Sequence, residues 1–155
     1  MIRALLSFIA GGVLVAAFFI VRQFTGDLPP SEFASPESSA ALARQMEALK
    51  PHLLDMARAE PAEMRAILDE NFYGPKIAEA RELYAVTETP REIAGVYTEV
   101  FEPAGGVPEE NSGRVLINLH GGGFTVGART EGRLESIPVA AVAGMRVISV
   151  DYRQG

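Results

Sequence analysis

Three consecutive glycines, Gly121, Gly122 and Gly123, directly follow a short apolar run and limit how this chain can fold. The run covers residues 115–119, and its almost continuous apolar character is typical of a central strand buried on both faces of a sheet. Glycine costs backbone entropy and provides no side-chain packing. Three glycines at a strand end therefore indicate a main chain that bends sharply or approaches a ligand.

The residues after the glycines predict a helix and a second buried strand. Apolar positions recur at helical spacing over residues 129–143, where Pro138 is expected to bend the helix and Gly144 to end it. Residues 146–150 form another apolar run, and a strand that ends at Pro103 is expected over 93–103. Strand, glycine-rich turn, helix and strand make a βαβ unit, so we expect an α/β fold with a parallel sheet.

The region before these strands is predicted to be helical. Residues 35–37, Ser-Pro-Glu, are a typical helix start, and Pro51 is expected to kink the helix that follows. A second helix is expected to open at residues 60–63 and to stop near 71–74, and a third short helix is expected over 77–83. His52 lies in this helical region and is interpreted as a structural residue, because no partner serine or acid stands in a recognisable arrangement with it.

Composition narrows the possible functions. The chain has a formal charge of −6 and no basic run, which disfavours binding to nucleic acid. It contains no cysteine, which excludes disulfides, thiolate metal sites and a cysteine nucleophile. We expect neither a metal nor a cofactor. The acidic helical region is interpreted as a solvated surface, with a partner-binding surface as the alternative.

The N-terminus carries an uncharged apolar run over residues 4–21, between Arg3 and Arg22. As a helix it would be about 27 Å long, close to the hydrocarbon thickness of a bilayer. We expect residues 1–22 to be a membrane anchor that leaves the rest of the chain outside the cytoplasm. A cleaved signal peptide, with secretion of the rest, and a buried soluble helix are the alternatives. Residues 23–39 are rich in proline, serine and acids and are expected to form a tether.

Two chemistries could use the glycines, a phosphate cradle or an oxyanion hole. A dinucleotide fingerprint starting at Gly121 requires glycine at position 126, which is Val126. A P-loop starting at Gly122 requires lysine and then serine or threonine after Gly127, but Ala128 and Arg129 stand there. The nucleotide-binding alternative thus lacks residues that it needs.

By contrast, all the residues that an oxyanion hole of this kind requires are present in the sequence. His-Gly-Gly-Gly-Phe over 120–124 and Val-Asp-Tyr-Arg over 150–153 resemble the hormone-sensitive-lipase-like branch of the α/β-hydrolase superfamily, which contains carboxylesterases and lipases. The resemblance covers residues 93–155, and the helical region is similar to the cap helices of such enzymes. It implies a doubly wound α/β-hydrolase sheet. Where the family often continues with Leu-Ala-Pro, this chain has Gln154 and Gly155.

The resemblance also implies roles for individual residues. The main-chain N–H groups of Gly122 and Gly123 would bind the tetrahedral oxyanion, while Gly121 shapes the turn and His120 orders the loop. Phe124 and Tyr152 are candidate walls of a pocket for a small-molecule ester. Asp151 and Arg153 stand at a strand end, where such residues commonly bond neighbouring loops, so structural roles are expected for both.

The sequence provides no nucleophile for this oxyanion hole. Gly-x-Ser-x-Gly does not occur in the 155 residues, and the family places its serine, acid and histidine after the 150–153 strand end. We therefore expect the N-terminal portion of an ester hydrolase, inactive alone, with a helical cap-like region over 40–90 and the first strands of an incomplete hydrolase domain over 91–155. The alternatives are a membrane-anchored interaction module and a nucleotide-binding βαβ domain.

Overall fold

The structure, a computed structural model, describes residues 31–154. The expected anchor or signal segment, residues 1–22, and the first part of the expected tether lie outside the described residues. Among residues 31–154, no helix combines the length and the apolar character that crossing a membrane requires. The chain divides into two compact units between Lys50 and Pro51, and each unit is described by itself.

The described part of the first unit is built on helix α2 (Pro36–Leu49). The Ser35 side chain accepts a hydrogen bond from the N–H of Ser38 at 3.1 Å, and this cap confirms the predicted helix start. Helix α2 ends before Pro51, which has no N–H to donate to a preceding turn. A 3₁₀ turn (Lys50–His52) and the short helix α3 (Leu53–Met56) follow, so the predicted kinked helix is two helices.

The second unit continues with helix α4 (Pro61–Leu68), which a capping box between Glu60 and Glu63 starts as predicted. The predicted stop near residues 71–74 is wrong. A π turn (Asp69–Tyr73) carries the chain directly into helix α5 (Gly74–Leu83). A side chain on Gly74 would lie 2.7 Å from the carbonyl oxygen of Asp69, so glycine here permits the close backbone approach that keeps the helix continuous.

A four-stranded mixed sheet forms the centre of the second unit. Its strands are β1 (Val86–Ile93), β2 (Val96–Pro103), β3 (Val115–Asn118) and β4 (Arg146–Val150), in the order β1-β2-β4-β3. Strands β3 and β4 are parallel, as the βαβ pattern predicts. The β1–β2 and β2–β4 pairs are antiparallel, so the expectation of a wholly parallel sheet is wrong.

Strands β1 and β2 form a hairpin where the sequence predicts one strand over 93–103. Ala94 and Gly95 connect them with φ angles of 52° and 79°. Two positive φ angles in a two-residue loop are the requirement of a type I′ turn, which matches the twist of paired strands. Ile93 therefore ends β1 rather than beginning β2. Strand β1 contains Pro90, which fits its position at the edge of the sheet.

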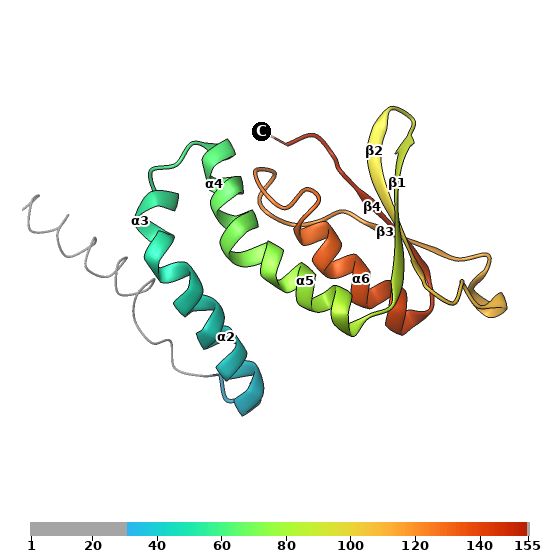
Figure 1. The fold of residues 1–155 in the computed structure, drawn as a ribbon, viewed down its shortest axis with the longest axis horizontal. Coiled ribbons are helices and arrows are strands. Elements are labelled where there is room, and N and C mark those ends of the chain that lie inside the picture. Colours follow the sequence, from blue (N-terminus) through green and yellow to red (C-terminus); the bar gives the residue numbers. More distant parts are fainter. Residues whose placement is uncertain (1–30, 155) are drawn as a thin grey trace, which may run out of the picture. The chain divides into compact units, whose positions relative to one another are not determined.

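Helix α6 (Glu131–Ala143) packs across the sheet, and α5 packs against α6. In Figure 1, α4, α5 and α6 all lie to one side of the four strands. The centre of this layer is fully buried and consists of Phe101, Val147, Ile137 and Ala140. The helix ends at Gly144, whose φ of 61° makes it a left-handed C-cap, as predicted.

Strand β3 differs from the prediction that it is buried on both faces. Asn118 points toward α6, because its side chain donates to the Ser136 hydroxyl at 3.1 Å. Ile117, the adjacent residue along the strand, points to the opposite face and is 61% exposed. Among the described residues, β3 has only β4 as a neighbour. The apolar run thus lies at a sheet edge with one face open.

Three ion pairs connect elements of the second unit. The Arg133 guanidinium on α6 donates two hydrogen bonds to the Glu99 carboxylate on β2, one of them at 2.8 Å. Glu99 is buried. Arg81 makes a two-bond pair with Glu88 at 2.7 Å, and this pairing lowers the pKa of Glu88. The third pair, Arg146 with Glu102 at 2.6 Å, is the most solvent-exposed of the three.

Candidate active site

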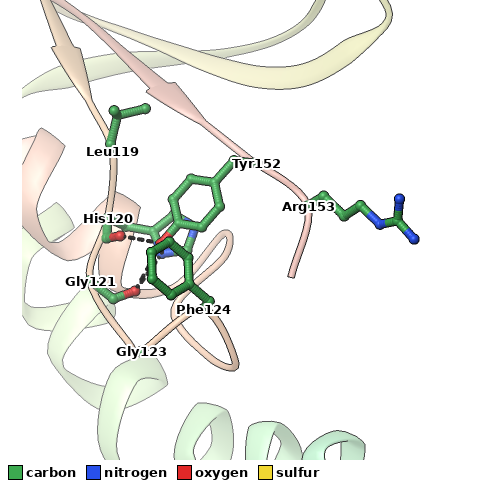
Figure 2. Close-up of a pocket in the computed structure, with 7 residues that line it drawn as sticks. All are labelled: Leu119, His120, Gly121, Gly123, Phe124, Tyr152 and Arg153. Carbon is green, nitrogen blue, oxygen red and sulfur yellow. Dashed lines mark hydrogen bonds between the residues drawn. The ribbon is translucent and has the colours of Figure 1, made fainter. Parts of the chain in front are cut away.

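The candidate site lies at the carboxyl ends of β3 and β4. Because these strands are parallel and adjacent, the segments that follow them meet at the same edge of the sheet. They enclose an open pocket of about 580 Å³, and Figure 2 shows its lining side chains. The pocket is lined by Leu119, His120, Gly121, Gly123, Phe124, Tyr152 and Arg153. Five of the six predicted site residues therefore line one pocket, and the sixth, Gly122, lies between two of them in the chain.

Gly122 occupies a position that only glycine can fill. Its φ is 100°, and its carbonyl oxygen accepts hydrogen bonds from the N–H groups of Thr125 and Val126, each at 3.1 Å. A side-chain carbon at Gly122 would lie 2.7 Å from the carbonyl carbon of Val126 and would overlap the carbonyl oxygen. The tight turn over 122–126 therefore forms only because residue 122 is glycine, which has no side chain.

Gly123 has a left-handed backbone but open surroundings. Its φ is 61°, and a side-chain carbon there would have no atom within 4 Å. Within residues 31–154, no hydrogen bond of the structure takes the main-chain N–H of Gly122 or Gly123 as its donor. Two unpaired N–H donors beside an apolar pocket are what an anion or a carbonyl oxygen can bind.

Two further glycines hold the loop close to α6, and neither role was predicted from the sequence. Gly127 is buried with a φ of 101°, and a side chain there would lie 2.8 Å from both the Gly121 carbonyl oxygen and His120 Nδ1. A side chain on Gly132 would overlap the Ser149 hydroxyl on β4. The one sign of these roles in the sequence is that a glycine stands shortly before and shortly after residue 129, where the helix was predicted to start.

The first residue of α6 argues against a phosphate in the loop. The Glu131 carboxylate lies 3.1 Å from where a side-chain carbon of Gly121 would be. Tyr73 Oη donates to Glu131 Oε2 at 3.4 Å, and burial, followed by the charge of Glu131, raises the pKa of Tyr73 to about 12. A carboxylate beside the glycines at the helix N-terminus would repel the phosphate that a nucleotide site requires.

His120 and Tyr152 form the buried side of the pocket. His120 is 2% exposed, and its ring is stacked on that of Tyr152 at a centroid distance of 4.4 Å and an interplanar angle of 12°. Tyr152 Oη donates to the main-chain carbonyl oxygen of His120. Phe124 meets the Tyr152 ring edge to face at 6.0 Å and is 73% exposed. The structure thus brings the predicted wall residues together.

The polar residues after β4 have structural contacts. Arg129 Nε donates to Asp151 Oδ2 at 2.8 Å, and its guanidinium lies 4.0 Å from the centre of the Tyr97 ring. Asp151 is therefore held in an ion pair, in agreement with its expected structural role. Arg153 is exposed at the rim of the pocket. His52 lies in the 3₁₀ turn and is half-buried.

Two side chains that the sequence analysis did not select fix the far side of the loop. Gln154 Nε2 donates to the Val126 carbonyl oxygen at 2.6 Å. Arg65 Nε, from α4, donates to the Thr125 carbonyl oxygen at 2.7 Å. In both bonds the acceptor is a main-chain carbonyl of the turn. Because every residue has such a carbonyl, no sequence motif indicates these contacts.

The class that the fold defines is an α/β protein with a mixed sheet and a glycine loop at a strand end. Solved structures share this fold. The chain is similar to the crystal structure of an esterase, E25, with 24% identity and a TM-score of 0.57 over 82% of this chain and 39% of that one. It is also similar to an esterase from the bacterial hormone-sensitive lipase family, with 22% identity and a TM-score of 0.53 over 78% and 36%.

A third likeness is to the Francisella virulence factor BioJ, with 15% identity and a TM-score of 0.52 over 68% of this chain and 33% of that one. The chain therefore spans between 33% and 39% of the length of these three structures. No family model and no curated protein matches the sequence. The fold class is thus an α/β fold like that of these three structures.

Proposed function

We propose that this chain supplies the oxyanion loop of a serine-dependent carboxylic ester hydrolase. The observation that carries the proposal is the pair of unpaired N–H groups on Gly122 and Gly123, beside an apolar pocket at the carboxyl end of β3. Two of the similar structures are those of esterases, which supports the same reaction class. Because the chain spans about two fifths of those structures or less, the activity of the whole protein is part of the proposal.

In this reaction a serine oxygen forms a bond to the ester carbonyl carbon, while the π electrons of the carbonyl move to its oxygen. A histidine base takes the serine proton and returns it to the leaving alcohol as the oxyanion collapses and the C–O bond of the ester breaks, which leaves an acyl-enzyme. Water, deprotonated by the same histidine, then attacks the acyl carbon, and the carboxylic acid leaves as the serine regains its proton. The N–H groups of Gly122 and Gly123 donate to the developing oxyanion. Loss of one such donor costs on the order of 3 to 4 kcal/mol of transition-state stabilisation.

The serine of this scheme has to come from outside these 155 residues. No Gly-x-Ser-x-Gly occurs in them, and among the described residues neither His52 nor His120 has a serine partner. The His120 ring bonds the main-chain carbonyl of Gly121 in its own loop, which suits an ordering role and not that of a general base. We therefore propose that the chain alone does not turn over esters.

The pocket wall suggests an apolar ester group next to the scissile carbonyl. Leu119, Phe124 and Tyr152 contribute apolar surface to the lining. The exposed guanidinium of Arg153 at the rim is the one charged side chain among the lining residues, all of which belong to the described part of the chain. We propose a small, uncharged ester as the substrate.

The test is to read the coding sequence beyond Gly155 and to express the longer product. We expect a Gly-x-Ser-x-Gly segment, hydrolysis of a short-chain p-nitrophenyl ester and labelling of the serine by a phosphonate probe. The 155-residue chain is the matched control and is expected to show neither turnover nor labelling. A stop codon after Gly155, or probe-sensitive turnover by the control, contradicts the proposal.

For localisation, we propose that residues 1–22 anchor the protein and leave the remainder outside the cytoplasm. The apolar run and the charges at its two ends motivate this. Protease added to intact spheroplasts is expected to digest residues 31–154 of the membrane-bound protein. Protection until the membrane is lysed would show the opposite orientation, and recovery of a processed soluble product would show signal cleavage.

A further inference from the structure

The hydrogen bonds of His120 determine which of its ring nitrogens carries the proton. Nδ1 lies 2.8 Å from the carbonyl oxygen of Gly121, which can only accept a hydrogen bond. Nδ1 must therefore be the donor. Nε2 is buried and has no hydrogen-bond partner among the described residues. A second N–H at Nε2 would be buried without an acceptor, which is costly, so Nε2 is the bare nitrogen.

Tyr152 closes this arrangement from the adjacent strand end. Its hydroxyl donates to the His120 carbonyl oxygen and lies 3.4 Å from the Gly121 carbonyl oxygen and 3.5 Å from His120 Nδ1. Its ring covers one face of the imidazole. Figure 2 shows the hydroxyl directed at the carbonyl groups of the loop. Three polar atoms of the loop thus converge on one hydroxyl group.

Holding these carbonyls also orients the donors of the loop. A peptide group is planar, and its C=O and N–H point in opposite directions in the trans form. The Gly121 carbonyl and the Gly122 N–H belong to one peptide group. Fixing the carbonyl toward His120 and Tyr152 therefore directs the Gly122 N–H away from both rings and keeps it from turning back into the loop.

We propose that Tyr152 is a positioning residue for the oxyanion loop, acting through His120 held as the Nδ1–H tautomer. The tautomer and the hydrogen bonds follow from the geometry of the chain. Their meaning for catalysis rests on the proposed ester hydrolase function. Tyr152 touches no reacting atom in this scheme, because its hydroxyl is occupied by the His120 carbonyl.

The test is nitrogen-15 NMR of the full 155-residue chain labelled in histidine and glycine. The chain contains two histidines, so His52 is an internal reference for an imidazole in a turn. We expect His120 to show a protonated Nδ1 and an unprotonated Nε2 at neutral pH. A protonated Nε2 with a bare Nδ1 overturns the tautomer assignment.

The second arm uses Tyr152→Phe, which keeps the stacked ring and removes the hydroxyl. We expect the amide signals of Gly122 and Gly123 to move and the ring stacking on His120 to persist. Tyr84→Phe removes a hydroxyl on the connection between α5 and β1 and is the matched control, with both amide signals unchanged. Unchanged signals in Tyr152→Phe overturn the positioning role.

In the longer enzyme, Tyr152→Phe is expected to lower kcat about tenfold, less than the loss of a whole oxyanion donor, with KM within about twofold. If Tyr152 had a purely structural role, the variant would contain less folded enzyme, but the folded fraction would keep its kcat. If the longer product hydrolyses no ester while the NMR results hold, the proposed function fails and the hydrogen-bond arrangement stands. If hydrolysis occurs and kcat is unchanged in the variant, the positioning role fails alone.

Discussion

Substituting alanine at the two central glycines separates a steric requirement from a conformational one. Gly122 and Gly123 both have positive φ, but only Gly122 is crowded, by the carbonyl group of Val126. In Gly123→Ala the new methyl group points into open space, so the cost is that of a left-handed alanine, about 1 kcal/mol. In Gly122→Ala the strain of an unfavourable φ adds about 1 to 3 kcal/mol.

The Gly122 variant has a second cost. To admit the methyl group, the Val126 carbonyl has to move, and the two hydrogen bonds that the Gly122 carbonyl accepts are then lost. Each contributes about 1 kcal/mol net. We therefore expect the free energy of unfolding to fall by at least about 3 kcal/mol in Gly122→Ala, against about 1 kcal/mol in Gly123→Ala.

Urea unfolding followed by circular dichroism measures the difference, because the chain has no tryptophan to report by fluorescence. In thermal unfolding, each kcal/mol of lost stability lowers Tm by about 4 to 8 °C. Gly123→Ala is therefore expected to lower Tm by about 5 °C and Gly122→Ala by more than about 10 °C. The loop geometry described above would be refuted if the two variants had equal stability or if Gly122→Ala were the more stable one.

Three further predictions follow from the ion pairs and from Tyr73. Arg133→Met leaves a buried carboxylate without its cation and is expected to cost about 3 kcal/mol in urea unfolding, whereas Arg146→Met, at an exposed pair, stays within about 1 kcal/mol; equal losses would contradict the burial argument. The depressed pKa of Glu88 contributes stability at pH values above the unfolded value of 4.5, and this contribution is lost as the pH falls through the lower folded pKa. The free energy of unfolding, measured between neutral and acidic pH, should therefore depend less on pH in Glu88→Gln than in the unmodified chain. An equal dependence on pH in the two would count against the Arg81 pairing. In a spectroscopic titration of the four tyrosines, the component near pH 12 is expected to disappear in Tyr73→Phe, and its persistence would assign it elsewhere.

The elements that the sequence predicts well are those with a strong local signal. Helix α2 has a serine cap and a proline in its first turn, and α6 ends at a glycine in the left-handed conformation. The strands β3 and β4 are apolar runs, and their parallel pairing follows from the helix between them. These signals lie within or next to the element, so no information about distant contacts is needed.

Strand β1 was missed because the signals in its residues conflict: four of them are β-branched, which favours a strand, but the others include a proline and charged side chains. Its sequence, Val-Thr-Glu-Thr-Pro-Arg-Glu-Ile, contains proline and three charged side chains, and most of it is exposed. Pairing with β2 through the Ala94–Gly95 turn makes it a strand. The burial of β3 could not be predicted either, because an apolar run does not say whether the strand is central or at an edge of the described sheet.

In the candidate site, the sequence predicted the loop and the pocket wall but not the supports. His120, the glycines, Phe124 and Tyr152 belong to contiguous motifs, and the parallel strands bring these together. Gln154 and Arg65 act on main-chain carbonyls, a contact that depends on where the turn lies in space. Neither position carries a residue pattern that indicates such a bond.

The β4 tail has a consequence for the order in which the site can form. The bond from Tyr152 to the His120 carbonyl spans 32 residues, and the bond from Gln154 to Val126 spans 28. Both donors follow β4, which must first dock between β2 and β3. During synthesis from the N-terminus, the glycine loop leaves the ribosome before the groups that fix it. The N–H groups of Thr125 and Val126, which donate to the Gly122 carbonyl, should therefore gain protection from hydrogen exchange only in the last stage of folding, together with β4.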